Sequence, residues 1–201
     1  THHTNEIAQS EGAFGKPLAR YWLHGEHLVI ESRRMGKSEG NFVTLREVER
    51  RGFNPLSFRY LVLQSHYRTK INFTWESLEA ADRGLKNLYQ EIRRLAWTSG
   101  KRTSEKNDAE AEEKYNRLFT EAVNNDLNTP RALVVLQTVI GTSAIGPQVK
   151  LRLIKAVDEV LGLSLGVAAK TSRVPAKVRK LVAERESYRK NKQFIQSDRL
   201  R

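Results

Sequence analysis

The sequence predicts a mainly α-helical fold, and three features indicate it. Apolar residues recur at alternating spacings of three and four from Leu78 to Leu95, which places them on one face of a long helix. Prolines and glycines stand at positions where helices commonly begin and end. One short apolar run, at residues 28–30, is the strand candidate.

The N-terminal region combines a helix, a strand and a glycine-containing loop. Residues 2–11 have a helical pattern that begins abruptly, so we expect the chain to be a fragment or one half of an assembly. The apolar run 28–30 predicts a buried strand. A helix over about 45–51 should end at Gly52, where glycine commonly follows a helix. The Asn-Pro pair at 54–55 predicts the start of another helix.

Four longer helical segments predict a bundle. Thr74 can cap the first of them, and the second contains the apolar residues of 115–123. The third follows a turn and has Thr129 before a proline in its first turn. The fourth covers about 147–161 and ends at a glycine. The apolar stripe of the first helix is expected in the core rather than at a cofactor or partner: Leu78, Ala81, Leu85, Leu88, Ile92 and Leu95.

Polar segments separate and follow these helices. Residues 98–108 predict a loop, and the small and basic residues 166–173 predict a linker. Pro175 begins a further helix. Residues 192–201 continue a charged helical pattern without a terminator, so we expect the C-terminus to be truncated as well.

The chain carries a large excess of positive charge. Lys and Arg number 35 against 23 acidic residues, for a net charge of +12. Such an excess indicates a polyanionic partner, and a solvated basic surface is the alternative. Trp22, Trp75 and Trp97 could stack on bases, although packing favours a structural role. The candidates for phosphate contacts are Arg83, Lys86, Arg93, Arg94, Lys177, Arg179, Lys180, Arg185, Arg189 and Lys190.

Several protein classes are excluded by composition. No apolar run approaches the ~20 residues needed to span a bilayer, and the N-terminus has no signal-peptide pattern. The chain contains no cysteine, so it supplies neither a disulfide nor a thiolate metal ligand. We therefore expect a cytoplasmic protein without a membrane partner.

Residues 34–41, RMGKSEGN, are the most informative segment. They place cations, glycines and a hydroxyl in a loop after the predicted strand. Lysine and backbone N–H groups can neutralise a polyphosphate, and glycine lets the backbone approach it. The candidates for such a site are Arg34, Met35, Gly36, Lys37 and Ser38. For this segment alone, a basic turn between strand and helix is the alternative.

His2 and Glu6 are the candidate metal ligands. Four residues apart, they share one face of a helix, and zinc accepts both imidazole and carboxylate. Exposed polar residues at this spacing are common, so the spacing alone does not distinguish a metal site from a solvated face.

Six segments match one ordered set of motifs along nearly the whole chain. The motifs are HHxNEIAQSE, a tyrosine-containing strand region, KMSKS-x-GNF, D-x-N-T-P, D-x-x-L-G-L and N-K-x-F-x-x-S-D-x-L. The matching residues are 2–11, 21–24, 34–42, 126–130, 158–163 and 191–200. On these residues the chain resembles the C-terminal half of the cysteinyl-tRNA synthetases, which are class I aminoacyl-tRNA synthetases.

This resemblance implies a zinc site. In the family the positions of His2 and Glu6 ligate one Zn²⁺, and two cysteines from upstream sequence complete the site. That zinc binds the thiolate of the substrate cysteine and so selects against serine, in keeping with its preference for sulfur. The upstream half, with its HIGH motif, would lie outside this chain.

The resemblance also implies ATP, with Mg²⁺, as a substrate at the loop. Lys37 aligns with the second lysine of KMSKS and would meet the charge that develops as the adenylate forms. Arg34 replaces the first lysine and keeps its charge in a different geometry. Gly36 replaces the first serine, which removes a hydroxyl donor and loosens the loop. Lys37 and Arg34 are the catalytic candidates, and Ser38 could donate to a phosphate.

We interpret the chain as four parts of such a synthetase. Residues 1–53 would end a class I α/β catalytic domain, and 54–73 would be a connecting, stem-contact region. Residues 74–165 would be a tRNA-binding helical bundle, and 166–201 a linker and the start of a small anticodon-binding domain. The full-length, monomeric enzyme would activate cysteine with ATP and transfer it to tRNA(Cys), whereas this chain alone should be inactive.

Two alternatives remain at this point. One is a noncatalytic tRNA-binding fragment or paralogue. The other is a cysteine ligase of the mycothiol-biosynthesis type, which needs no anticodon-binding module.

Overall fold

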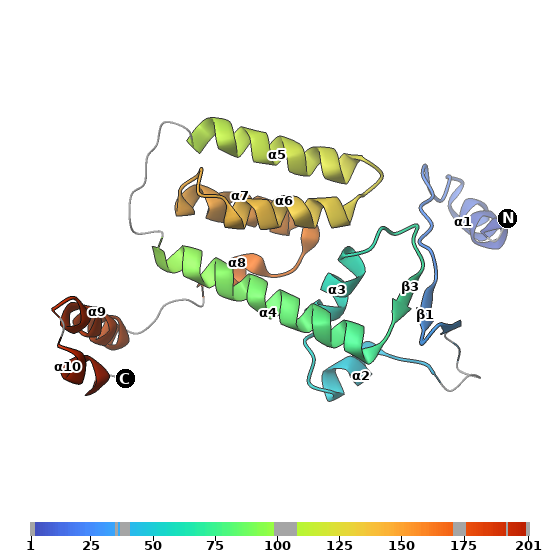
Figure 1. Cartoon of the computed structure of the whole chain (residues 1–201). Coiled ribbons are helices and arrows are strands. Elements are labelled where there is room, and N and C mark those ends of the chain that lie inside the picture. The colour runs from blue at the N-terminus through green and yellow to red at the C-terminus, as the bar shows by residue number, and fades with distance from the viewer. Residues whose placement is uncertain are drawn as a thin grey trace.

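The described part of the chain is mainly helical, as the sequence predicts (Figure 1). The computed structural model describes residues 3–34, 36, 41–98, 108–170, 176–191 and 193–199. A bundle of helices lies beside a small sheet that carries two short helices. Among the described helices, none is long and apolar enough to cross a membrane.

The sheet has three short strands. Strand β1 (Leu28–Ile30) lies between β2 (Arg33–Arg34) and β3 (Ile71–Phe73). It pairs antiparallel with β2, with Ile30 opposite Arg33, and parallel with β3, with Ile30 opposite Phe73. The prediction of a strand at 28–30 is confirmed.

The sheet and two helices share one small core. Helices α2 (Leu45–Arg50) and α3 (Pro55–Leu63) are capped by Thr44 and Asn54, which accept hydrogen bonds from first-turn N–H groups, and the predicted helix start at the Asn-Pro pair is confirmed. The buried residues of this core are Ile30, Val48, Phe73 and Leu78. Trp75 packs against it, 5.3 Å from the Phe73 ring and under the Arg51 guanidinium. Residues on both sides of the boundary predicted at residue 53 therefore belong to one core.

The bundle contains α4 (Trp75–Thr98), α5 (Asp108–Asn124), α6 (Thr129–Gly141), α7 (Pro147–Leu161) and α8 (Leu165–Lys170). Leu78 of the predicted α4 stripe is buried in the small core, the stripe from Ala81 to Ile92 is buried in the bundle core, and Leu95 is partly buried against the bundle core. Thr74 caps α4, since its Oγ1 accepts a hydrogen bond from Ser77 N at 3.1 Å. The predictions of a bundle core and of this cap are confirmed.

One predicted boundary is wrong. The linker expected over 166–173 begins as helix α8, because Leu165 and Ala168 are buried against the bundle. Helix α6 begins at Thr129, in the predicted turn, and Asn128 caps it, since its Oδ1 accepts from Arg131 N at 3.0 Å. The loop predicted over 98–108 lies largely outside the described residues.

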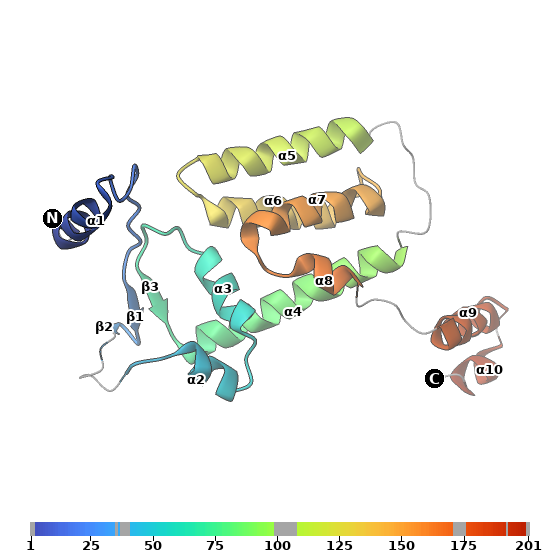
Figure 2. The same ribbon diagram turned by 180° about the vertical axis from the view of Figure 1, so that it is seen from behind.

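The remaining helices lie at the two ends of the molecule. Helix α1 (Thr4–Phe14) is near the upper end of β1. Helices α9 (Ala176–Lys190) and α10 (Phe194–Arg199) pack on each other beyond the C-terminal end of α4, as the view from behind also shows (Figure 2). The predicted helices near both termini are therefore present, and α1 extends further than residue 11.

The C-terminus of α7 is held by side chains from two other helices. Arg59 Nε, from α3, donates to the carbonyl oxygen of Leu161 at 2.6 Å. Tyr89 of α4 donates its hydroxyl to the Leu163 oxygen at 2.6 Å, and burial raises the pKa of this phenol. Asp158 Oδ1 accepts from Leu163 N at 2.8 Å. The chain reversal at Gly162, with φ of 62°, is therefore fixed on several sides.

Gly162→Ala is expected to destabilise the chain by about 1–3 kcal/mol. An alanine at this position would have to adopt a left-handed backbone, and its Cβ would lie 3.0 Å from Nη2 of Arg59. Urea unfolding of this chain measures the change. The matched control is Gly141→Ala at the end of α6, where a Cβ meets nothing within 4 Å, so stability should hold or rise slightly. Equal unfolding midpoints for the two variants would contradict this account of the α7 terminus.

Candidate functional site

The predicted phosphate-binding loop follows a tight hairpin formed by β1 and β2. Glu31 and Ser32 connect β1 to β2 and both have positive φ, at 49° and 65°. Two-residue hairpin turns of this kind match the twist of the paired strands. The loop therefore leaves the sheet directly after Arg34, at the edge strand β2.

Asn72 of β3 holds this hairpin in place, and sequence reasoning missed it. Ser32 N donates to Asn72 Oδ1 at 2.8 Å, and Asn72 Nδ2 lies 3.4 Å from Ser32 Oγ. Neither non-glycine turn residue favours a left-handed backbone, so a side-chain contact at this point stabilises the turn. The two partners are 40 residues apart in sequence, which is why no local pattern indicates the pair.

The far end of the loop is also anchored. Gly36 N donates to Asn41 Oδ1 at 3.0 Å, which joins these two residues directly. Gly36 is half-buried there. Met35, Lys37 and Ser38, and the side chain of Arg34, lie outside what the structure describes. The described residues thus give the frame of the loop and not the positions of its cations.

Of the two candidate metal ligands, Glu6 lies at the start of α1. The helix begins at Thr4 and has His3 at its N-cap position, so His2 precedes the helix and lies outside the described residues. The Glu6 carboxylate is in the first turn and exposed. Among the described residues, no group of three or more His, Asp or Glu side chains could hold a metal ion. Glu6 is thus the one candidate ligand that the structure describes.

His3 lies in an aromatic cluster beside these candidates. Its ring stacks on Trp22 with centroids 4.6 Å apart, and it lies 5.1 Å from the His24 ring. These contacts attach the start of α1 to the segment before β1. They give Trp22 a stacking partner, although its side chain is 41% exposed, close to the 44% of Trp97.

The basic candidates of α4 share one face of that helix. Arg83, Lys86, Arg93 and Arg94 are exposed on the side opposite the buried stripe. Three of them have acidic partners on the same helix: Arg83 with Glu79 at 2.8 Å, Lys86 with Asp82 at 2.6 Å, and Arg94 with Glu91 at 3.6 Å. Exposed pairs of this kind are weak and exchange readily for a phosphate.

Lys86 differs from its neighbours because its partner is buried. Asp82 is 5% exposed, and its Oδ1 accepts from Ser57 Oγ at 2.8 Å. Lys86 therefore neutralises a carboxylate that joins α3 to α4. Removing that charge would leave a buried acid unpaired, so Lys86 has a structural role.

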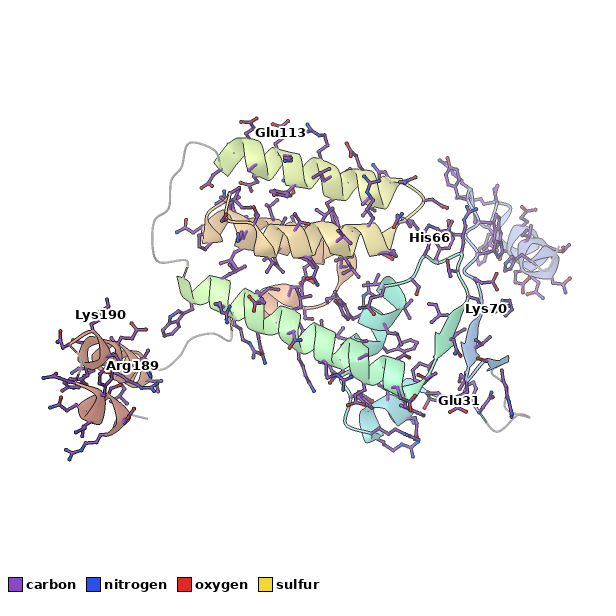
Figure 3. All side chains as sticks on the ribbon, in the orientation of Figure 1. Glu31, His66, Lys70, Glu113, Arg189 and Lys190 are labelled. Carbon is purple, nitrogen blue, oxygen red and sulfur yellow. The ribbon has the colours of Figure 1, made fainter. Side chains whose placement is uncertain are left out.

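The basic candidates of α9 form a separate group. Lys180 is exposed, and Arg185 is half-buried with no hydrogen-bond partner for its Nε among the described residues. The side chains of Lys177 and Arg179 lie outside the described part. Arg189 and Lys190 project from α9, apart from the bundle (Figure 3). The described structure does not bring the α9 group together with the α4 group.

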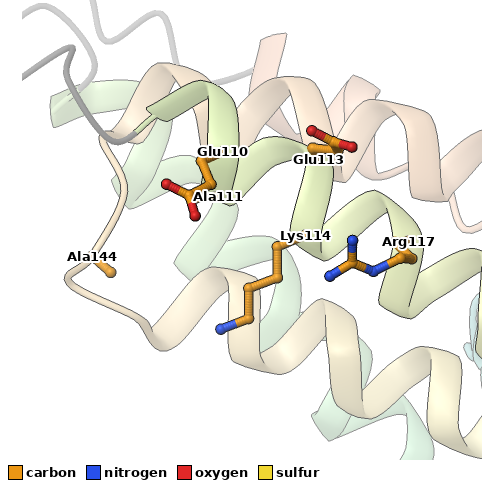
Figure 4. A pocket seen from close by; sticks show the side chains of 6 residues that line it. All are labelled: Glu110, Ala111, Glu113, Lys114, Arg117 and Ala144. Carbon is orange, nitrogen blue, oxygen red and sulfur yellow. The ribbon is translucent and has the colours of Figure 1, made fainter.

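Two hollows of the described surface are lined by residues other than the predicted site residues. One lies at the start of α5, beside the loop that joins α6 to α7 (Figure 4), and it is lined by Glu110, Ala111, Glu113, Lys114, Arg117 and Ala144. Its two acids lie one helical turn before its two bases on the same helix, as is usual for a solvated face. An apolar hollow between α7 and α8 is lined by residues such as Leu151, Ile154 and Val167.

Comparison with known proteins gives one consistent family. Residues 1–83 match the family model of the class I (C) tRNA synthetase catalytic domain. The whole chain is 42% identical to cysteine–tRNA ligase 1 of Burkholderia lata, of which it covers 41%. It is 40% identical to the cysteine–tRNA ligase of Chlamydia felis, of which it covers 44%. Over 82% of the chain it is 39% identical to the ligase of Treponema denticola, covering 37% of that protein. The chain thus spans about two fifths of the length of these relatives.

Proposed function

We propose that this homologue of the cysteine–tRNA ligases is one part of such a ligase. That part contains the KMSKS-like loop and the tRNA-binding helices. The whole protein would activate cysteine with ATP, release pyrophosphate and transfer the cysteinyl group to tRNA(Cys). The observation that carries this proposal is the 42% identity to cysteine–tRNA ligase 1 over the whole chain.

The loop would form one side of the adenylate site. Charge develops on the α-phosphate and on the pyrophosphate leaving group as the adenylate forms, and a preplaced cation stabilises it. Lys37 is our choice for this cation, with Arg34 as a second one. The Asn41 and Asn72 contacts support this role, because they hold both ends of the segment on which these cations lie.

His2 and Glu6 would contribute half of a zinc site. The donors fit, since zinc accepts an imidazole and a carboxylate, and Glu6 is exposed at the start of α1. The other ligands would come from cysteines outside this chain, which itself has none. Bound there, zinc would supply a Lewis acid that recognises the thiolate of cysteine.

The domain assignment is part of the proposal. Residues 1–53 and 54–73 would act as one unit at the end of the catalytic domain, since they share a core. The bundle over 74–165 would lie along the tRNA, and residues from 166 would lead into the anticodon-binding domain. This chain alone should not activate cysteine, because the amino-acid pocket, the HIGH motif and half of the zinc ligands would lie elsewhere in the protein.

Binding of this chain to tRNA is expected to depend steeply on salt. With several of the candidate cations in contact with phosphates, affinity should fall by about 10²-fold or more between ~50 and ~200 mM salt. Arg93→Gln should lower the slope of log Kd against log salt by about 1. Arg117→Gln on α5 is the matched control and should leave the slope unchanged. Salt-insensitive binding, or no binding at low salt, would rule out the RNA-binding surface.

Cysteine-dependent ATP–pyrophosphate exchange by the full-length protein tests the proposed activity. We expect label to enter ATP only when cysteine is present. Sequencing the segment upstream of residue 1 is the companion test, and it should contain a HIGH motif and two cysteines suited to the zinc site. A protein with neither exchange nor these motifs would instead be a noncatalytic tRNA-binding protein.

A further inference from the structure

The turn between α5 and α6 is clamped to the segment between α3 and β3. Tyr67 donates its hydroxyl to Asp126 Oδ1 at 2.6 Å. Arg68 Nε lies 3.0 Å from Asp126 Oδ2, and Arg68 Nη2 donates to Asp126 Oδ1 at 3.3 Å. His66 Nε2 lies 2.8 Å from the backbone oxygen of Asp126. We call these four residues the Asp126 junction, and Figure 3 shows His66 beside the α5–α6 turn.

The junction is electrostatically matched. The hydrogen bond from Tyr67, with the positive charge of Arg68, lowers the pKa of Asp126. In return, the Tyr67 hydroxyl and the Asp126 charge raise the pKa of Arg68. Arg68 Nε also donates to the Tyr67 hydroxyl at 2.8 Å, so the three side chains form one network. Networks of this kind position their members more firmly than one exposed ion pair does.

The backbone at the junction has an unusual conformation. Asp126 and Leu127 both have positive φ, at 55° and 52°, although neither is glycine. Leucine in this region is disfavoured, and such a conformation persists when surrounding contacts determine it. The contacts are present: Leu127 N donates to the Val123 oxygen, and Asn128 N to the Ala122 oxygen. The turn therefore presents the Asp126 carboxylate in one defined direction.

The other side of the junction continues toward α1. The backbone oxygen of Tyr67 accepts from Glu26 N at 2.7 Å. Glu26 follows His24, whose ring lies 5.1 Å from the His3 ring. The backbone of Tyr67 thus contacts the segment between α1 and β1, and its hydroxyl contacts the bundle.

We propose that Asp126 is a positioning residue, which acts through Tyr67 and Arg68 to fix the α5–α6 end of the bundle against the catalytic end of the chain. The tRNA must contact the bundle while its 3′ end reaches the adenylate, so the angle between the two parts determines where that end lies. Helix α4 joins the two parts by entering both cores, and the junction strengthens the attachment of the α5–α6 pair beside the contacts between α3 and α6. This inference rests on the proposed function.

The test uses Asp126→Asn in the full-length protein. Asparagine keeps the size of the side chain and tolerates positive φ, but it loses the charge that holds Arg68. Charging of tRNA should fall about 10-fold in kcat/KM, mainly through a higher KM for tRNA. Cysteine-dependent ATP–pyrophosphate exchange should stay within about 2-fold, because it needs no tRNA. Tyr67→Phe should behave in the same way.

The matched control is Glu121→Gln on α5. It also changes an exposed acid to its amide, and it breaks a weak pair with Arg117 at 3.9 Å, so charging should be unchanged. Normal charging by Asp126→Asn, or an equal loss of exchange and charging, would overturn the positioning role. A wild-type protein that neither exchanges nor charges would overturn the proposed function itself, and this role with it.

Discussion

Lys37→Ala in the full-length protein is expected to lower cysteine-dependent ATP–pyrophosphate exchange by about 10²–10³-fold. The lysine lies between Gly36 and Asn41, which are joined by the hydrogen bond from Gly36 N to Asn41 Oδ1. The ammonium group of Lys37 would stabilise the charge that develops in the transition state, and alanine supplies nothing in its place. The measurement is kcat/KM for ATP in the exchange reaction.

Lys155→Ala is the control for this substitution. Lys155 is exposed on α7, in the helical bundle. Its replacement by alanine removes the same positive charge from the protein. Exchange by this control should stay near normal. Near-normal exchange by Lys37→Ala would remove Lys37 from its proposed role.

Glu6→Ala is expected to abolish stoichiometric zinc binding by the full-length protein and to lower cysteine activation by more than about 100-fold. The carboxylate is exposed in the first turn of α1, where a metal could reach it without disrupting a core. Zinc content by elemental analysis is the first measurement, and kcat/KM for cysteine in the exchange reaction is the second.

Glu11→Ala is the matched control on the same helix. It removes an exposed carboxylate from α1 and should leave both zinc content and cysteine activation unchanged. Full zinc occupancy in Glu6→Ala would show that Glu6 is not a ligand.

The helical bundle could be predicted from sequence because its signals are local. The spacing from Leu78 to Ile92 determines which face of α4 is buried, and those side chains are buried in the core. Thr74 and Gly162 mark helix ends by the chemistry of their own residues, and the structure has them in those roles. Each of these features depends on residues within a few positions of one another.

Features that depend on distant partners could not be predicted. Helix α8 has few large apolar residues, and its burial depends on α4 and α7. Strand β3 is recognisable only through its pairing with β1. Asp126 and Leu127 adopt positive φ in a turn that is held by the distant residues Tyr67 and Arg68.

The candidate site also combines residues that local motifs indicate with contacts between residues distant in sequence. The motif letters indicated Lys37, His2 and Glu6, which stay predictions because the comparisons and the described residues do not test their roles. The contacts that support the site, Ser32 with Asn72 and Tyr67 with Asp126, join residues 40 and 59 positions apart. No periodicity or spacing in one sequence indicates such pairs.

Charging of tRNA(Cys) by the full-length protein, with cysteine and with serine, tests the central claim most directly. We expect cysteine to be esterified to the tRNA with a kcat/KM about 10⁴-fold or more above that for serine. Absence of cysteinyl-tRNA formation by the folded, zinc-loaded protein, or equal charging with both amino acids, would contradict the assignment.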